Sequence, residues 1–291
     1  YPFGTQAEIL DDHYEGLRHS IYAKEPVEEF PRVTVGSSLC KQPYSASVLN
    51  ISAMSFGSLS KNAIIALNKG AKKGEFYHNT GEGGLSDYHI EPGGDLVWQL
   101  GTGYFGCRTQ EGKFEPKKFK EKAAIPNVKM IEIKLSQGAK PGHGGVLPGI
   151  KNTLEIARMR DIEPYKTVIS PPSHNQFNDA KGLIHFVKEL RDLSEGKPIG
   201  FKLCIGRTEE FIELCEVMKS EGIWPDFITV DGAEGGTGAA PLEFADSVGV
   251  PLEPALIFVQ STLKKYGLRD EIKVIASGKV LTAFSILRMK A

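Results

Sequence analysis

The sequence has few cysteines and no long hydrophobic run. Only four of its 291 residues are cysteine, and no two of them form a C-x-x-C pair. This spacing excludes a zinc ribbon and a thioredoxin-type dithiol, and it is typical of reduced thiols in the cytoplasm. No stretch approaches the run of about 18 apolar residues that a membrane-spanning helix needs. We therefore expect a cytoplasmic protein with no membrane segment in this chain.

An excess of one charge is also missing. There are 35 Lys and Arg residues against 36 Asp and Glu, with no long run of either sign. This balance argues against a polybasic protein that binds nucleic acid or a membrane surface. Hydrophobic residues make up 41% and charged residues 24% of the chain. These proportions are typical of a globular protein with a full core and exclude global disorder.

Glycine, in contrast, is abundant and clustered. The chain has 32 glycines, and more than half of them lie within residues 81–106, 138–149 and 232–238. Each cluster follows a strand-like run. Because glycine permits positive φ angles and a close approach of the backbone, the clusters predict loops shaped around a ligand. Tight surface turns are the alternative interpretation.

From residue 47 onwards, short apolar runs alternate with helical patterns at the spacing of βα units. Residues 1–46 are expected to form an irregular arm packed on the main domain, 47–291, and residues 81–127 a long insertion. The expected strands are 47–53, 76–80, 128–134, 167–170, 198–205, 226–230 and 272–277. The expected helices include 58–71, 149–160, 180–193, 209–221 and 254–266.

This alternation predicts an α/β fold with a parallel sheet. The first strand is not followed by G-x-G-x-x-G, which disfavours an open dinucleotide-binding sheet. Polar and glycine-rich residues follow nearly every strand instead, as in a (β/α)8 TIM barrel. Because seven strands are expected and the chain starts at Tyr1, the barrel is expected to be truncated before its eighth strand.

Several polar residues are expected at the carboxyl ends of these strands. Lys134 ends an apolar strand and is followed by Gln137 and Lys140; such a lysine can stabilise negative charge on a ring that is being reduced. The alternative is a structural pair with a carboxylate such as Glu132. Glu82 lies between glycines. There it is expected to face a substrate or to hold a lysine, and the alternative is an exposed turn residue.

Two later loops suit an anion, and one histidine needs a separate interpretation. Asp231 begins a glycine-rich stretch whose backbone amides predict an anion nest, and 277–279 ends the next strand at a helix start. Together they predict a phosphorylated cofactor, with plain structural turns as the alternative. His174 follows a Pro-Pro turn, and we favour a structural or hydrogen-bonding role over acid–base catalysis.

These motifs resemble the FMN-binding domain of glutamate synthase, in its short glutamate synthase-related branch. The resemblance covers residues 47–291, and the motifs run in the same order. They are MSFGSLS (54–60), NTGEGG (79–84), KLSQGAKPGHGG (134–145), LPG (147–149), ISPP (169–172), DGAEGGTGAAP (231–241) and GLRD (267–270).

The resemblance implies a barrel that binds FMN and reduces 2-iminoglutarate, formed from 2-oxoglutarate and ammonia, to L-glutamate. It implies catalytic roles for Lys134 and Glu82. It implies substrate binding by Met54, Ser55, Gln137 and Lys140. It implies cofactor binding by Ser52, Thr80, Asp231, Gly235, Gly236, Thr237, Gly278 and Lys279.

The chain also departs from the family. His143 stands where the large enzymes commonly have an acidic residue, and the four cysteines are not clustered as ligands of an iron–sulfur cluster. No metal site is expected. Ammonia is expected from a glutaminase subunit, and electrons from an NAD(P)H reductase subunit or ferredoxin. A homo-oligomer is left open. The alternatives are an enzyme of the N-methylglutamate synthase type, which uses another amine, and a non-catalytic scaffold barrel.

Overall fold

The computed structural model describes residues 17, 20–138, 140–235 and 240–290. It divides into two compact units. The main unit runs from Pro31 to Lys279 and holds all the other helices and strands of the described residues. The second unit consists of Tyr1–Phe30 and Val280–Ala291, and among its described residues Ala283–Lys290 form the helix α8.

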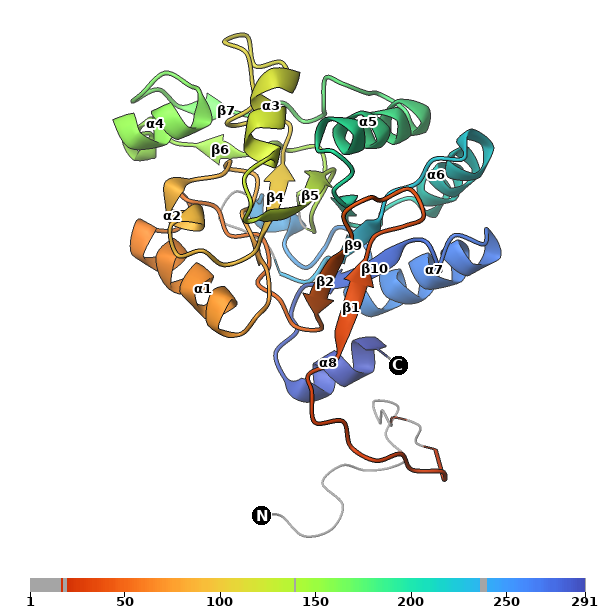
Figure 1. Cartoon of the computed structure of the whole chain (residues 1–291). Helices are drawn as coiled ribbons and strands as arrows, with labels where there is room; N and C mark the ends of the chain where they lie inside the picture. Colours follow the sequence, from red (N-terminus) through yellow and green to blue (C-terminus); the bar gives the residue numbers. More distant parts are fainter. Residues whose placement is uncertain (1–16, 18–19, 139, 236–239, 291) are drawn as a thin grey trace. The chain divides into compact units, whose positions relative to one another are not determined.

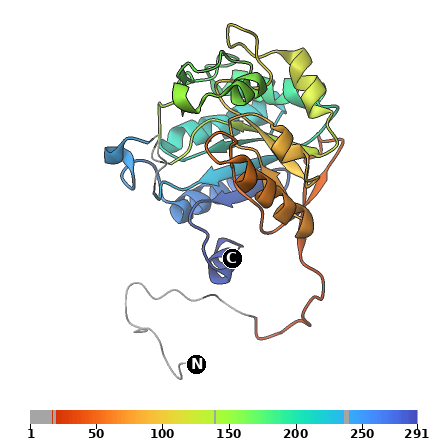
Figure 2. The same cartoon turned by 90° about the vertical axis from the view of Figure 1, so that its left-hand side faces the viewer.

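A six-stranded parallel sheet forms the centre of the main unit, and helices cover its outer side (Figure 1, Figure 2). Ile51 adds a single parallel bridge to His78 beyond one edge. The sheet is curled into a half-barrel, which confirms the predicted α/β class with parallel, TIM-barrel-like strands. The strand order is β10 (Lys273–Ser277), β9 (Phe227–Asp231), β8 (Ile199–Leu203), β5 (Val128–Lys134), β4 (Leu96–Leu100) and β3 (His78–Asn79).

The helices of the main unit follow the strands along the chain. Ser60, Thr153 and Asp179 each cap a helix, because their side chains accept a hydrogen bond from a backbone amide of the first turn. The helices are α1 (Lys61–Lys73), α2 (Asp87–Ile90), α3 (Pro116–Ala123), α4 (Leu154–Arg160), α5 (Ala180–Leu193), α6 (Thr208–Glu221) and α7 (Leu252–Lys265). Two short 3-10 helices span Gly149–Lys151 and Leu242–Phe244.

One strand of the sheet comes from residues 81–127, which we expected to form a long insertion. The prediction that 167–170 belongs to the sheet is wrong: β7 (Val168–Ile169) pairs antiparallel with β6 (Val146–Leu147). β4 takes a central place instead, within the expected insertion 81–127, and β5 pairs directly with β8. All five β4 residues are buried, whereas Ile169 is 72% exposed. The glycines around β4 therefore mark the ends of a buried strand.

An antiparallel hairpin packs against the amino-terminal ends of the sheet strands. It consists of β1 (Arg32–Val35) and β2 (Tyr44–Ser47). Of the expected strand 47–53, the first residue belongs to β2, and only the single bridge at Ile51 joins the parallel sheet. Hairpin and sheet share a cluster of buried apolar residues, which closes this end. Its members are Val35, Tyr44, Ala46, Tyr77, Val97, Met130 and Phe227. A ligand site must therefore lie at the opposite, carboxyl ends of the strands.

Further along the strands, a polar layer surrounds the buried carboxylate of Glu132. One of its oxygens, Oε1, accepts hydrogen bonds from Asn79 Nδ2 (2.8 Å) and Gln99 Nε2 (2.6 Å). The other, Oε2, accepts one from Thr229 Oγ1 at 2.5 Å. Because each oxygen of the carboxylate accepts at least one hydrogen bond, this polar layer joins β3, β4, β5 and β9.

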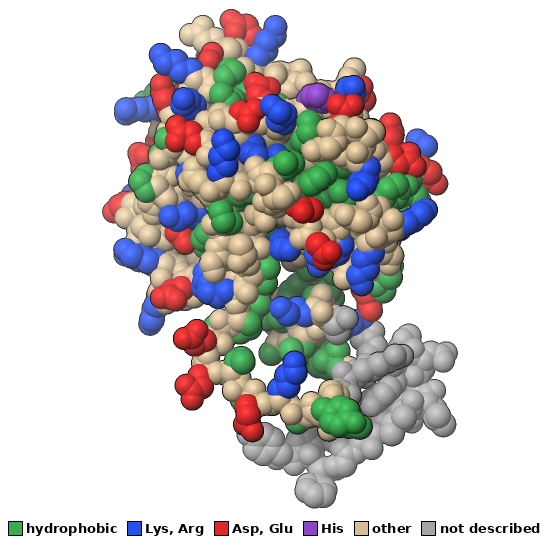
Figure 3. Space-filling view, turned by 45° about the vertical axis from the view of Figure 1, so that its right-hand side comes forward, with side chains coloured by type: hydrophobic (Ala, Val, Ile, Leu, Met, Phe, Trp, Pro, Cys, Tyr) green, Lys and Arg blue, Asp and Glu red, His purple; other side chains and the backbone are tan. Residues whose placement is uncertain are grey.

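The surface carries no large region of one charge sign on the face drawn in Figure 3, where acidic and basic side chains are interspersed. Among the residues that the structure describes, no helix is long and apolar enough to cross a bilayer.

Two buried histidines, His78 in β3 and His89 in α2, predict a loss of stability in acid. Burial, with a contribution from His89, lowers the pKa of His78 to about 3, and burial lowers the pKa of His89 to about 4. As the pH falls below about 6.5, the unfolded chain binds protons that the folded chain does not. The free energy of unfolding should therefore fall by about 1.4 kcal/mol per pH unit for each histidine, down to about pH 4.

Urea unfolding at about pH 7 and about pH 5 measures this loss. His78→Asn should show a smaller pH dependence than the original chain. His185→Asn is the matched control, because the His185 side chain is 50% exposed. An equal pH dependence of all three proteins would contradict the prediction.

Candidate active site at the carboxyl ends of the strands

Glu82 and Lys134 meet at the carboxyl end of the sheet. Lys134 is the last residue of β5, and Glu82 follows β3. Lys134 Nζ donates to Glu82 Oε1 (2.9 Å) and to Gln137 Oε1 (2.5 Å). Glu132, the alternative partner, is fully engaged in the polar layer instead. Three of the residues that we selected from the sequence therefore form one bonded group.

Two further cations surround Glu82. Lys140 Nζ lies 3.9 Å from Glu82 Oε1, and its side chain is only 5% exposed. Arg160, at the end of α4, donates from Nη2 to the carbonyl of Phe56 (2.9 Å), and its guanidinium lies 4.9 Å from the centre of the Phe105 ring. Arg160 Nε is buried and has no hydrogen-bond partner among the described residues.

The sequence analysis missed Arg160. A basic residue in the last turn of a helix is common because it complements the helix dipole, so its position gave no signal. In the structure, however, Arg160 is only 6% exposed, and its Nε is an unsatisfied donor beside a charged cluster. Such a donor fits an anionic ligand.

The electrostatics of the cluster favour a bound anion. Burial alone would raise the pKa of Glu82, but Lys134, Lys140 and Arg160 outweigh burial and hold that pKa below its usual value. Burial lowers the pKa of Arg160 to about 10 and also lowers the pKa of Lys140. Three cations thus face one carboxylate, and the cluster carries an excess of positive charge.

The segment after Ile51 is held against the loop after β3. Ser55 Oγ accepts a hydrogen bond from the Gly83 amide at 3.2 Å. Gly81 has a φ of +67°, and a Cβ added there would lie 2.3 Å from Ser55 Oγ. Glycine is therefore required at position 81 for both conformation and space. Met54 is partly buried beside this contact, in the apolar cluster of Phe56 and Leu147.

The other predicted residues of these two segments differ in accessibility. Ser52 is exposed, and its Oγ lies 3.5 Å from Ser277 Oγ at the end of β10. Thr80 is fully buried, and its hydroxyl contacts the Gly81 carbonyl and the Gln99 amide, each at 3.1 Å. Thr80 therefore shapes the loop from within, and its contact with a cofactor stays a prediction.

The predicted phosphate loops follow β9 and β10. A Cβ added at Gly235, where φ is +81°, would lie 3.2 Å from Lys279 Cε, so these loops adjoin. Gly278 also has a positive φ, of 120°. The Gly235 amide is already bonded to the carboxylate of Asp246. Of the remaining cofactor residues, Gly236 and Thr237 lie outside the described residues.

Asp231 joins two parts of the site. Its Oδ2 accepts from the Gly138 amide at 3.2 Å, and its Oδ1 lies 3.5 Å from Lys202 Nζ. The sequence analysis missed Lys202, which is 7% exposed in β8. The signal was present, because Lys202 is a lysine inside an apolar strand, as Lys134 is.

The two singled-out histidines have different surroundings. His174 is 7% exposed, and its Nε2 lies 2.9 Å from the Lys134 carbonyl, which agrees with a hydrogen-bonding role. His143 is exposed, and its Nδ1 lies 2.8 Å from the carbonyl of Pro141. In the part of the chain that the structure describes, no group of three or more His, Cys, Asp or Glu residues could hold a metal ion.

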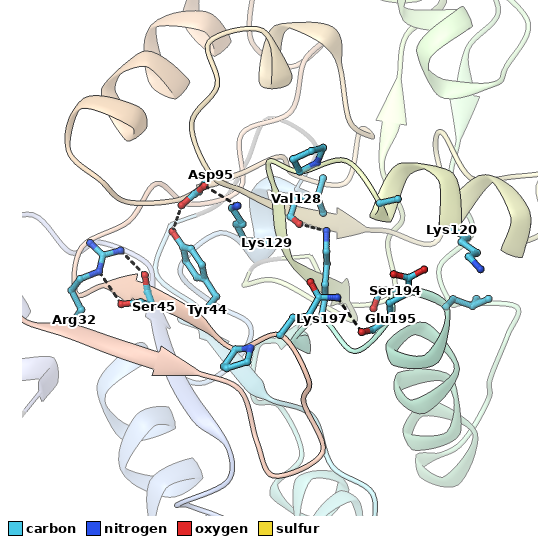
Figure 4. Close-up of a pocket in the computed structure, with 15 residues that line it drawn as sticks. Arg32, Tyr44, Ser45, Asp95, Lys120, Val128, Lys129, Ser194, Glu195 and Lys197 are labelled. Atoms are coloured by element: carbon cyan, nitrogen blue, oxygen red, sulfur yellow. Dashed lines mark hydrogen bonds and ion pairs between the residues drawn. The ribbon is translucent and has the colours of Figure 1, made fainter.

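A cavity of about 640 Å³ lies away from this cluster, beside the β1–β2 hairpin (Figure 4). Its polar groups hold the fold together. Tyr44 OH donates to Asp95 at 2.9 Å, and Lys197 Nζ donates to the carbonyls of Ala123 and Val128, each at 2.5 Å. None of the predicted site residues lines this cavity.

Comparisons with known proteins agree on one family. The family model described as the conserved region in glutamate synthase matches residues 19–291. The glutamate synthase large subunit-like protein YerD of Bacillus subtilis (strain 168) is 43% identical over 273 residues, which are 93% of this chain and 51% of that protein. The archaeal glutamate synthase (NADPH) of Methanocaldococcus jannaschii is 35% identical over 239 residues, 82% of this chain and 44% of that protein. The chain thus spans about half the length of these curated relatives.

Proposed function

The chain belongs to the glutamate synthase family, and from this premise we propose that it is an FMN-dependent oxidoreductase that makes L-glutamate. Its substrate is 2-oxoglutarate, which condenses with ammonia to 2-iminoglutarate before reduction. The observation that carries the proposal is the excess of positive charge around Glu82. Lys140 and Arg160 are nearly buried, yet among the described residues they have one carboxylate neighbour between them, Glu82, which they share with Lys134.

A dicarboxylate suits this arrangement. Charge-assisted hydrogen bonds to a carboxylate are the strong ones, and a guanidinium can form two of them in parallel. Arg160 has an unsatisfied Nε, and Lys140 is bonded to Glu82 only at long range. We infer that these two cations take the substrate carboxylates. A ligand with a single negative charge would leave part of the positive charge uncompensated.

The loops after β9 and β10 fit the phosphate of FMN. Gly235 and Gly278 have positive φ angles and carry no side chain of their own, and the Lys279 side chain lies beside Gly235. The Gly235 amide donates a hydrogen bond to the carboxylate of Asp246, so the loop has room for an anionic group beside this amide. When bound, reduced FMN supplies the hydride for the reduction.

Glu82 and Lys134 have complementary tasks in this proposal. The lowered pKa of Glu82 keeps its carboxylate ionised at neutral pH, and an ionised carboxylate stabilises the positive charge of a protonated imine. Lys134 Nζ donates to Glu82 Oε1 and Gln137 Oε1, which fixes the direction of its ammonium group. That group stabilises negative charge that develops beside it. A glutaminase subunit and a reductase or ferredoxin are the proposed suppliers of ammonia and electrons.

Absorbance between about 300 and 550 nm, measured after FMN is added and the protein desalted, tests the cofactor site. We expect a retained flavin band near 450 nm that 2-oxoglutarate perturbs. Lys279→Met should weaken FMN binding by about 1–3 kcal/mol, because it removes a cation at the phosphate. Lys264→Met is the control, since Lys264 is exposed on α7. A chain that retains no flavin would contradict the proposal.

A further inference from the structure

Lys134 stands where β5 loses one of its neighbours. The amides of Leu135 and Ser136 both donate to the Lys202 carbonyl in β8, at 2.9 and 3.3 Å. On the other side, the pairing with β4 ends at Leu100, opposite Ile133. Because hydrogen-bonding groups alternate between the two neighbours along a strand, the Lys134 carbonyl points beyond the end of β4. Among the strands that the structure describes, none supplies a donor to this carbonyl.

His174 supplies that donor. Its Nε2 lies 2.9 Å from the Lys134 carbonyl, and its Nδ1 lies 2.7 Å from the Tyr104 hydroxyl. A carbonyl oxygen only accepts hydrogen bonds, so the proton must be on Nε2. The neutral ring then accepts the Tyr104 proton at Nδ1. Burial lowers the pKa of His174, which favours this neutral form.

The surroundings hold the ring in this orientation. His174 stacks on Phe177, with ring centres 4.9 Å apart and planes at 20°. Tyr104 is fully buried, and its backbone has a φ of +45°. A positive φ is a strained conformation for a bulky residue, and such strain persists only where the surroundings enforce it. Here that conformation accompanies the contact of the Tyr104 hydroxyl with His174.

We propose that His174 is a positioning residue for Lys134, and that Tyr104 selects the tautomer that makes this possible. The bond from Nε2 fixes the last peptide group of β5, and with it the direction in which the lysine side chain leaves the strand. The ammonium group then meets Glu82 and Gln137. The inference deepens the proposed function and rests on it for its catalytic consequence, whereas its geometric part is testable without cofactor or substrate.

Nitrogen NMR of the histidine-labelled chain tests the tautomer. At neutral pH, the His174 signals, assigned by their loss in His174→Gln, should show a protonated Nε2 and an unprotonated Nδ1. A proton on Nδ1, or on both nitrogens, would overturn the proposal.

Competitive acetylation, read by mass spectrometry, tests the positioning of Lys134. His174→Phe keeps a ring against Phe177 but removes the donor. We expect Lys134 to react at least about threefold faster in this variant, relative to the exposed Lys117. If this variant does not fold, Tyr104→Phe replaces it, with an expected increase of about twofold. An unchanged relative rate in the folded variant would overturn the proposal.

His89 provides the matched control. It is buried, as His174 is, and its Nε2 lies 3.0 Å from a different carbonyl, that of Met54. His89→Gln should leave the relative acetylation rate of Lys134 unchanged, whereas a general loosening of the fold would raise this rate in every variant.

With FMN and substrates, His174→Phe should lower kcat about tenfold or more with little change in FMN affinity. If the original chain shows no turnover, the proposed function fails, while the tautomer and acetylation results still judge the positioning role.

Discussion

Lys134→Met should lower the rate of glutamate formation from 2-oxoglutarate and ammonia by about 100- to 1000-fold in the FMN-loaded protein. This is the usual effect of removing a preorganised donor from developing charge. The structure gives two reasons. The Lys134 ammonium is held by Glu82 and Gln137, and its removal deprives the Glu82 carboxylate of its nearest cation. The pKa of Glu82 should then rise, so less of the carboxylate is ionised at neutral pH.

Stopped-flow measurement of flavin reoxidation checks this result. Lys113→Met is the control, because Lys113 is an exposed lysine and is not one of the cations that act on Glu82. The substitution should affect the rate much more than the affinity for FMN. A Lys134→Met variant that turns over as fast as the control would remove Lys134 from the proposed machinery.

Asp226→Asn should destabilise the fold by about 3–5 kcal/mol, because it breaks a buried ion pair and leaves Arg191 without its counterion. Asp226 is fully buried, and its Oδ2 accepts from Arg191 Nη2 (3.0 Å) and from the Ile199 amide (2.8 Å). Its Oδ1 accepts from the amide and the hydroxyl of Ser37, at 2.7 and 2.6 Å. One carboxylate therefore joins the β1–β2 connection, α5 and the first residues of β8 and β9.

Chemical unfolding measures this loss. Asp192→Asn is the matched control, because Asp192 is paired with Lys188 on the same helix but is 67% exposed. Loss of this ion pair should lower the free energy of unfolding by less than about 0.5 kcal/mol. Equal midpoints for the two variants would show that the Asp226 network does not stabilise the fold.

The parts of the fold that the sequence predicted well are those where burial and periodicity agree. The expected strand 128–134 coincides with β5, and the expected helix 180–193 coincides with α5. β4 was missed because its four apolar residues and Gln99 lie between glycine-rich turns, which are typical of a loop insertion. The error at 167–170 has the opposite cause: the two apolar residues of β7, which pairs only with the short strand β6 outside the main sheet, have the same local pattern as a short buried strand.

Local sequence patterns also predicted only part of the candidate site. The motif order led to Glu82, Lys134, Gln137 and Lys140, and the structure brings these residues together. Their chemical roles remain predictions. Arg160 was missed because only the packing of α4 against the segment around Phe56 brings it to Glu82. No local pattern encodes such a long-range contact.

Single-turnover oxidation of the reduced, FMN-loaded protein tests the central claim most directly. The flavin is reduced without oxygen, and 2-oxoglutarate is added with ammonium, with methylammonium, or alone. The account predicts fast reoxidation with ammonium and one glutamate formed per flavin, with little reaction for 2-oxoglutarate alone. A faster reaction with methylammonium would assign another amine donor. A flavin that stays reduced under all three conditions would contradict the account.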